Sequence, residues 1–196
     1  MHSFQPKNLI LGSASPRRKA LLEAMGLEFE LRQADMEESY PEGLTGHQIT
    51  DYLARQKATI LRADLDQDSL LLTADTVVWF NNSVLEKPAD MNEAQETLRR
   101  LSGQWHEVIT SVCFSGIAKQ LTEHAVTSVK FTDLSEQMID TYLQIGHPLD
   151  KAGAYGIQEW IGLVGVETIR GSYTNVVGLP TELVYKTLRT MVPGGN

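Results

Sequence analysis

The sequence predicts an α/β fold, because apolar segments with the periodicity of strands alternate with segments that have the periodicity of helices. The alternation continues along the chain without a low-complexity linker or an internal repeat. A chain of 196 residues fits one domain with a substantial core, and such a domain has room for two lobes. We therefore expect a single α/β domain over residues 1–196.

The first expected element is a short buried strand at residues 9–11, which are all apolar. A small polar loop follows. Ser15 and Pro16 then have the residue types of an N-cap and of a first helical position, so a helix begins here. After this helix, residues 28–32 have the pattern of a second strand.

The next helix is expected at residues 45–64, where Thr45 and Gln48 form a capping-box pair. A strand at residues 69–80 follows, rich in Val, Leu and Thr. The sequence Asn-Asn-Ser after it predicts a turn that leads back along residues 84–88.

A further helix is expected at residues 92–103, with Asn92 and Gln95 as a second capping box and Gly103 as its end. The remaining expected elements are strands at residues 106–116 and 123–132, helices at 135–146 and 180–191, and a glycine-rich segment without a clear pattern at 147–180.

Composition limits the partners and the compartment of the protein. The formal net charge is −8, which argues against a nonspecific nucleic-acid or membrane surface, since both favour an excess of Lys and Arg. A single cysteine, Cys113, excludes an internal disulfide and a cysteine-based zinc site. The first residues are too short and polar for a signal peptide, and no apolar run approaches the length of a membrane span. We expect a cytoplasmic protein that binds neither nucleic acid nor membranes.

The first helix carries two arginines next to its N-terminus, where free backbone amides attract anions. Arg18 shares a helical face with Leu21, Leu22 and Met25, so it lies on the side that packs inward. This pattern indicates a phosphate site that includes Arg17. By spacing alone, a capped helix with solvated arginines explains the pattern equally well.

A lysine interrupts the apolar face of the second long helix. Ile49, Leu53, Lys57 and Leu61 follow one another at steps of four, which places them on one stripe. Such a lysine either extends to solvent or places its ammonium group in a cleft that holds an anion. Lys87, after a short strand, leaves the same two alternatives open.

Asp75 lies in the middle of an expected strand, where aspartate is disfavoured and is rarely buried without a partner. Its carboxylate suits either of two tasks, which are to hold Mg²⁺ on a triphosphate or to deprotonate a water molecule. Glu38 follows the second strand, where it either supplies a further oxygen ligand or is an ordinary solvated loop acid.

Several common catalytic motifs are absent. The chain contains no P-loop, no dinucleotide-binding glycine motif, no nucleophile elbow and no His-Glu-x-x-His sequence. The five histidines share no ligand spacing, so the spacing gives no indication of a histidine site for a transition metal. Oxygen ligands with Mg²⁺ or Mn²⁺ fit the residues better.

The chain resembles a known family in several ordered segments. They are LILGSASPRRKALLEAMG, RQKA, TADTVV, LEKPAD, LRRLSGQWHEVITSV, LDKAGAYGIQ and GSYTNVVGLP. In this order they look like the Maf family of nucleoside triphosphate pyrophosphatases, over residues 8–190.

The resemblance implies a two-lobed fold with a mixed sheet and a central cleft, of the type that the Maf and inosine-triphosphatase proteins share. It also implies hydrolysis of a nucleoside triphosphate to the monophosphate and pyrophosphate with a divalent metal cofactor, Mg or Mn. By similarity, the phosphates contact Ser13, Ser15, Arg17, Arg18, Lys57 and Lys87, the metal binds at Glu38 and Asp75, and Asp75 is also the catalytic base.

Three positions that differ between substrate classes of the family are Arg17, Thr76 and Gln158 in this chain, which is the combination of relatives acting on dTTP and UTP. The amide of Gln158 donates and accepts at once, as the O4 and N3–H edge of thymine or uracil requires. Modified pyrimidine nucleotides are a further substrate class that this combination admits.

Two other functions stay open at this point. One is a nucleotide-binding regulator of cell division with little turnover, and the other is purine-triphosphate hydrolysis of the inosine-triphosphatase type. We expect a homodimer, since small acidic α/β enzymes often form two-fold dimers.

Overall fold

The computed structural model of the chain describes residues 5–191. Within them, a seven-stranded sheet has the order β2-β1-β3-β5-β6-β7, with β4 beside β3. Its strands are β1 (Asn8–Gly12), β2 (Glu30–Arg32), β3 (Ser69–Phe80), β4 (Ser83–Leu85), β5 (Trp105–Ser115), β6 (Gln120–Phe131) and β7 (Val166–Arg170).

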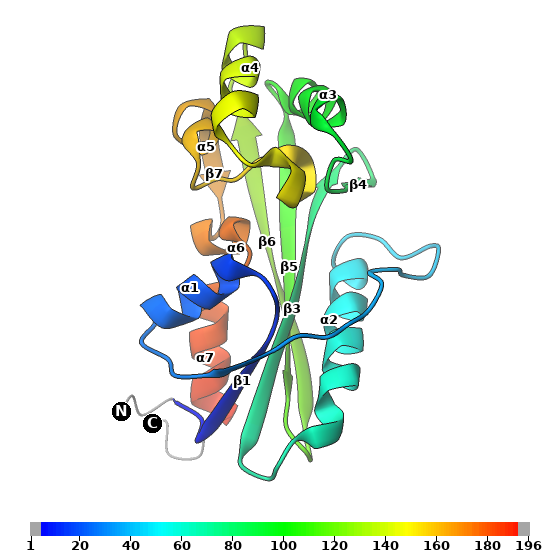
Figure 1. Ribbon diagram of the computed structural model, residues 1–196, viewed down its shortest axis with the longest axis vertical. Coiled ribbons are helices and arrows are strands. Elements are labelled where there is room, and N and C mark those ends of the chain that lie inside the picture. Colours follow the sequence, from blue (N-terminus) through cyan, green and yellow to red (C-terminus); the bar gives the residue numbers. More distant parts are fainter. Residues whose placement is uncertain (1–4, 192–196) are drawn as a thin grey trace.

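Parallel and antiparallel pairing meet at β3. Strand β1 is parallel to both β2 and β3, whereas β4, β5, β6 and β7 join the sheet by antiparallel pairs. Strands β3, β5 and β6 have 12, 11 and 12 residues, and Figure 1 shows them crossing most of the height of the molecule. The predicted α/β class with a mixed sheet is confirmed.

Helices cover both faces of the sheet. They are α1 (Pro16–Ala24), α2 (His47–Leu61), α3 (Met91–Leu101), α4 (Glu136–Ile145), α5 (Trp160–Gly165), α6 (Tyr173–Val177) and α7 (Thr181–Met191). Three single 3₁₀ turns, η1 (Arg62–Asp64), η2 (Pro148–Asp150) and η3 (Ala152–Ala154), connect longer elements.

Successive side chains of β3 point to opposite faces of the sheet and so pack against different helices. Leu72 belongs to a buried cluster with residues of α1 and α7, whereas Leu71 packs with residues of α2 on the opposite face. Further along, Val78 and Phe80 join a cluster with residues of α3 and α4. Two groups of helices therefore share one sheet: α1, α2 and α7 surround its lower half in Figure 1, and α3, α4 and α5 its upper half.

The predicted start of α1 is confirmed, because the Ser15 side chain accepts a hydrogen bond from the backbone N–H of Arg18. At α2, the Gln48 side chain accepts from the backbone N–H of Thr45 at 3.0 Å, which is one half of a capping box. The N-cap of α2 is Gly46, however, so the helix begins two residues later than predicted.

The predicted capping box of α3 at Asn92 and Gln95 is wrong. Asp90 is the N-cap, and its side chain accepts hydrogen bonds from the backbone N–H groups of Asn92 and Glu93. The Glu93 side chain accepts a hydrogen bond from the backbone N–H of Ala89. The N-cap thus lies two residues earlier than predicted, and the Glu93 side chain reaches the residue before it rather than the N-cap itself. Gln95 instead donates to a carboxylate of α4.

Residues 147–180 contain more regular structure than the sequence indicated. Helices α5 and α6 and strand β7 lie here, together with two of the 3₁₀ turns. Each has only five or six residues, or three in the turns, which is too short to show a periodicity of 3.6 or 2 in the sequence.

None of the helices within residues 5–191 combines the length and the apolar character needed to cross a membrane. The expected domain over residues 1–196 also includes residues 1–4 and 192–196, which lie outside the described residues.

Candidate active site

A cavity of about 620 Å³ opens at a gap in the sheet, along one edge of β3. Strand β1 pairs with β3 up to Thr73, and β4 pairs with it from Val78 onward. The edge of β3 between these two residues is therefore not covered by either strand. The cavity has the size of a small-molecule site, and we call it the cleft.

The cleft brings together every residue that the sequence indicated for the site. Its lining includes Ser13, Ser15, Arg17, Arg18, Glu38, Lys57, Asp75, Thr76, Lys87 and Gln158. Their positions come from α1 and its preceding loop, α2, β3 and the loops that follow β2, β4 and η3, which are far apart in the sequence.

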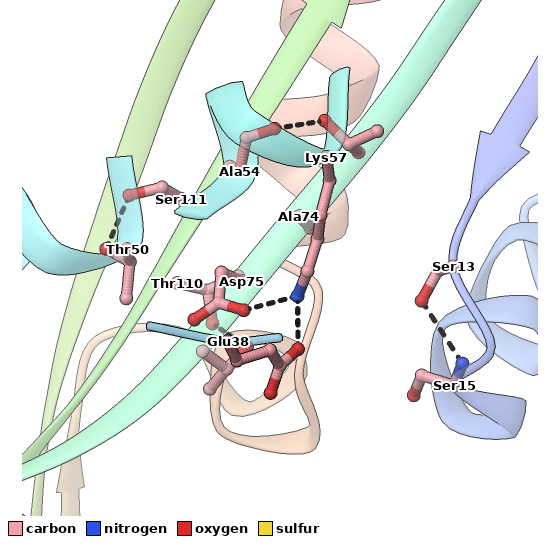
Figure 2. A network of polar contacts seen from close by, with 12 residues as sticks. Ser13, Ser15, Glu38, Thr50, Ala54, Lys57, Ala74, Asp75, Thr110 and Ser111 are labelled. Atoms are coloured by element: carbon pink, nitrogen blue, oxygen red, sulfur yellow. Dashed lines mark hydrogen bonds and ion pairs between the residues drawn. The ribbon is translucent and has the colours of Figure 1, made fainter. Parts of the chain in front are cut away.

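The loop between β1 and α1 is fixed by its own serines. The backbone N–H of Ser15 donates to Ser13 Oγ at 3.1 Å, as Figure 2 shows, and Ser15 Oγ accepts from the N–H of Arg18. Gly12 ends β1 at this point, where a Cβ atom would come within 2.7 Å of Leu61 and Thr73 side-chain atoms. A close approach of β1 to its neighbours thus sets where the loop begins.

Arg18 is directed into the protein, as its helical face predicted. Its Nε donates to the carbonyl of Gly178 at 2.9 Å, and its Nη1 to that of Ala74 at 2.9 Å. Nη1 also donates to Ser13 Oγ, and Nη2 donates to Thr76 Oγ1 at 3.0 Å. These bonds use four of the five N–H groups of the guanidinium, so Arg18 joins α1, β3 and the loop after α6.

Asp75 and Lys57 form the buried centre of the site. Lys57 Nζ donates to Asp75 Oδ1 at 2.6 Å and to Glu38 Oε1 at 2.6 Å, and Figure 2 shows the ammonium between the two carboxylates. Asp75 has 6% of its surface exposed. Lys57 therefore places its ammonium group in the cleft and does not extend it to bulk solvent. This is one of the two positions that the sequence left open for Lys57.

Burial and charge act against each other on these carboxylates. Burial raises the pKa of Asp75 above its ordinary value, and the positive charges of Lys57 and Arg18 offset this only in part. Burial also opposes the ionisation of Glu38. Here the hydrogen bond and charge of Lys57, with Lys87 and Arg18, outweigh burial and lower the pKa.

Glu38 reaches the cleft because its loop is anchored on both sides. Met36 and Tyr40 pack against a buried cluster that includes Ile49 of α2 and Val77 of β3. Glu38 Oε2 lies 4.0 Å from Nζ of the exposed Lys87.

The upper half of the molecule contributes a second charged group, which the sequence did not indicate. Lys151 is 4% exposed, and its Nζ lies 2.6 Å from Asp150 Oδ1 and 2.7 Å from Glu159 Oε1. Asp150 Oδ2 also accepts from Arg17 Nη1 at 3.1 Å, which connects the two halves across the cleft. A lysine followed by Ala-Gly-Ala has no spacing that distinguishes it from a surface residue. The signal that could have found it is the segment LDKAGAYGIQ, which is one of those that resemble the family.

Gln158 and Thr76 occupy different surroundings in the cleft. Gln158 is exposed, in a segment held by the buried ion pair of Lys151 and Glu159. Thr76 Oγ1 bonds with Thr110 Oγ1 at 2.9 Å and accepts from Arg18, so it belongs to the floor of the cleft.

The chain matches the family described as "Maf-like protein" over residues 8–191. It is 50% identical over 182 residues to the dTTP/UTP pyrophosphatase of Flavobacterium psychrophilum, with 93% of each chain covered. It is 43% identical over 192 residues to the dTTP/UTP pyrophosphatase of Phocaeicola vulgatus, with 97% of this chain and 100% of that protein covered.

Among solved structures, the Staphylococcus aureus Ham1 protein aligns with 94% of this chain and 100% of its own, at a TM-score of 0.48 and 12% identity, which is too distant to bear on activity. The family match and the two relatives, in contrast, extend over nearly the whole chain and include every segment that forms the cleft. The chain belongs to the Maf-like protein family.

Proposed function

We propose that this chain is a nucleoside triphosphate pyrophosphatase that hydrolyses dTTP and UTP to the monophosphate and pyrophosphate. The observation that carries the proposal is the Lys57 ammonium between the carboxylates of Asp75 and Glu38, with 12% of the lysine side chain exposed, in a cleft that also contains Arg17 and Lys87. Relatives up to 50% identical are named dTTP/UTP pyrophosphatase, which supports the same substrates here.

In the proposed reaction a water oxygen attacks the α-phosphorus, and the bond from this phosphorus to the oxygen that bridges it to the β-phosphate breaks. Asp75 accepts the proton of the water. Lys57 engages Oδ1, so the second oxygen of the carboxylate is the proton acceptor. General-base assistance of this kind contributes about 10²–10⁴ in rate.

The pyrophosphate that leaves carries the negative charge, and basic side chains stabilise it. Lys87 is exposed and Arg17 is partly exposed, and each is paired with an acidic side chain that is at least half exposed. Exposed pairs are weak, so a triphosphate can replace Asp150 and Glu38 as their partner. The serine loop and the N-terminus of α1 complete the phosphate site.

A divalent metal of the Mg²⁺ or Mn²⁺ type fits this donor set. The carboxylates of Asp75 and Glu38 each place one oxygen 2.6 Å from Lys57 Nζ, so the two groups are close enough to share one cation. Hard cations prefer such oxygen ligands. These two residues would hold the metal. When bound, it would neutralise charge on the triphosphate oxygens.

Gln158 supports the choice of pyrimidine substrates. Its exposed amide side chain lines the cleft. An amide there can donate to O4 and accept from N3–H of thymine or uracil, whereas cytosine presents the reverse pattern.

A panel of nucleoside triphosphates tests the proposal. Purified protein is incubated with dTTP, UTP, CTP, ATP or GTP, with and without Mg²⁺ or Mn²⁺, and the nucleotide products and pyrophosphate are separated and quantified. We expect monophosphate and pyrophosphate in equal amounts from dTTP and UTP. Release of diphosphate and inorganic phosphate, or saturable binding of dTTP without any product, would overturn the proposal, and the second result would favour a nucleotide-binding regulator.

The homodimer stays a prediction. Light scattering coupled to size-exclusion chromatography measures the mass of the particle and decides between one chain and two.

A further inference from the structure

Two histidines and an aspartate meet on the α2 face of the sheet, outside the cleft. His47 is the first residue of α2, and Asp51 follows one helical turn later on the same side. His124 lies on β6, at a position that pairs with Ser111 of β5. Sequence spacing does not indicate this group, because 77 positions separate the two histidines and the packing of α2 on the sheet brings them together.

The three side chains bring possible ligand atoms close together. One nitrogen of each histidine and one carboxylate oxygen of Asp51 all lie within 4.8 Å of one another. The imidazole rings of His47 and His124 are stacked, with centroids 4.2 Å apart and an angle of 18° between the planes. His124 Nδ1 is 3.8 Å from Asp51 Oδ1.

These separations are close to those of a metal centre. Tetrahedral zinc with bonds of about 2.0–2.1 Å to nitrogen and oxygen places its ligand atoms roughly 3.3 Å apart. His47 and His124 are exposed, so their side chains are free to rotate out of the stack, turn one nitrogen each toward the ion and shorten the separations without disturbing the core. Their exposure also leaves access for the ion and for a water molecule as fourth ligand.

Asp51 is oriented by a second layer of hydrogen bonds. Ser111 Oγ donates to Asp51 Oδ1 at 2.6 Å, and the same Oγ is bonded to Thr50 Oγ1 at 2.6 Å, as Figure 2 shows for the latter pair. Metal-binding side chains are commonly fixed in this manner by outer hydrogen bonds. An ordinary surface pair of histidine and aspartate needs no such support.

We propose that His47, Asp51 and His124 bind one divalent transition-metal ion of the zinc type. Imidazole nitrogens favour zinc and its neighbours over Mg²⁺ and Mn²⁺, so this site differs in kind from the carboxylate pair of Asp75 and Glu38. The ion joins the start of α2 to β6. The inference goes beyond the proposed function and does not depend on it, since it concerns binding without nucleotide.

The test uses the full chain without an affinity tag, freed of metal and titrated with Co²⁺ as a spectroscopic probe for zinc. We expect one equivalent of Co²⁺ with visible d–d absorption, which Zn²⁺ abolishes by displacement and an excess of Mg²⁺ does not. Zinc should also raise the melting temperature of the protein, since the ion binds only the folded arrangement of α2 and β6.

His124→Ala should abolish the Co²⁺ absorption, and Ser111→Ala should weaken Co²⁺ binding by about 10–100-fold through loss of the outer hydrogen bond. His147→Ala is the matched control, because His147 is an exposed histidine away from the group, and it should bind as the parent does. Urea denaturation verifies that each variant is folded. Absence of Co²⁺ binding by the parent, or equal binding by His124→Ala, would overturn the proposal.

Discussion

The Nζ atom of Lys57 lies 2.6 Å from Oδ1 of Asp75, in the interior of the cleft, where Asp75 is almost fully buried. A buried carboxylate costs several kcal/mol without a partner. Lys57 supplies this partner from the neighbouring helix, and it also contacts Glu38. The ammonium group of Lys57 therefore stabilises the ionised carboxylates of both Asp75 and Glu38.

Replacing Asp75 by Asn should leave the fold intact and remove most of the turnover. The amide keeps the shape of the side chain but is not a base, so we expect kcat for dTTP to fall by about 10²–10⁴. Nucleotide affinity, measured by calorimetry without turnover, should change much less. Asp140→Asn on the surface of α4 is the matched control. A kcat within a few-fold of the parent would mean that Asp75 is structural.

Replacing Lys57 by Met should shift the pH dependence of activity. Lys57 opposes the effect of burial on Asp75, so its removal raises the pKa of Asp75 further. Asp75 acts as a base only when ionised, and activity rises as the pH increases through this pKa. The acidic limb of kcat/KM against pH should therefore move to higher pH. The exposed Lys186, which pairs with Glu182, provides the control Lys186→Met, and an unmoved limb would contradict the assignment.

The adjacent residues Arg17 and Arg18 should respond differently to Ala. Loss of Arg18 removes the donor to the carbonyl of Ala74 and leaves that of Gly178 with the long 3.5 Å bond from Thr76 Oγ1. The free energy of unfolding should therefore fall by about 1–3 kcal/mol per unsatisfied group. Loss of Arg17 removes an ion pair with the exposed Asp150, which costs less than about 1 kcal/mol. For Arg17→Ala the main effect should be a rise in KM for dTTP, of about tenfold for ~1.4 kcal/mol of lost binding.

Urea denaturation and steady-state kinetics on both arginine variants separate these effects. Equal loss of stability in the two proteins would refute the assignment of Arg18 as a connection between α1 and β3.

Gln158→Glu should reduce selectivity more than turnover. Gln158 is exposed, and a bound base would cover it. A mismatched hydrogen-bond pattern that is buried in this way costs roughly 1–3 kcal/mol, so the parent should prefer UTP to CTP by about tenfold to a hundredfold in kcat/KM. Glutamate only accepts hydrogen bonds when ionised, so the ratio should approach one. Gln137→Glu on α4 is the control for an added surface charge. Equal kcat/KM for UTP and CTP in the parent would refute the role of Gln158.

Buried His106 should make the protein less stable in mild acid. Burial lowers the pKa of His106 from 6.5 to about 4. Between these values the unfolded chain takes up a proton that the folded protein does not, so stability decreases as the pH falls from 6.5 toward 4. The shift corresponds to roughly 3 kcal/mol over the whole interval.

His106→Gln keeps a polar partner for the Tyr155 hydroxyl, which lies 2.7 Å from His106 Nε2. Urea denaturation from pH 7 down to pH 5 covers about 1.5 pH units below the ordinary histidine pKa. Over this range the free energy of unfolding should decrease less for His106→Gln than for the parent. The same slope in both proteins would show that another group titrates.

The sequence predicted the long elements because their side-chain periodicity is repeated several times. In β3, twelve residues contain enough Leu and Val to identify a strand, although nothing local indicated that it joins a parallel and an antiparallel part. The short elements after residue 147 were missed for the opposite reason. Pairing of β7 with β6 depends on contacts distant in sequence, which a single-sequence pattern does not contain.

The candidate site was predicted where residues contradicted their local surroundings. Arg18 and Lys57 stood on apolar helical faces, where a solvated side chain was also open, and Asp75 stood inside a strand. Other residues of the site, such as Gln158, were indicated only by the family resemblance. Lys151 contradicts nothing locally, since it lies in a loop, and its burial follows only from the ion pair with Glu159. The group of His47 and His124 likewise depends on tertiary packing and has no counterpart in sequence spacing.

The two halves of the molecule are built on the same continuous strands, and this fixes the width of the cleft. The part of β3 that neither β1 nor β4 covers, between Thr73 and Val78, spans roughly 13–17 Å at the rise of an extended chain. No hinge between separate bodies sets this length; it is fixed by covalent geometry and reinforced by β5 along its whole extent. The length of this part of β3 therefore stays constant when a ligand binds, and only loops and side chains adapt to the size of the ligand.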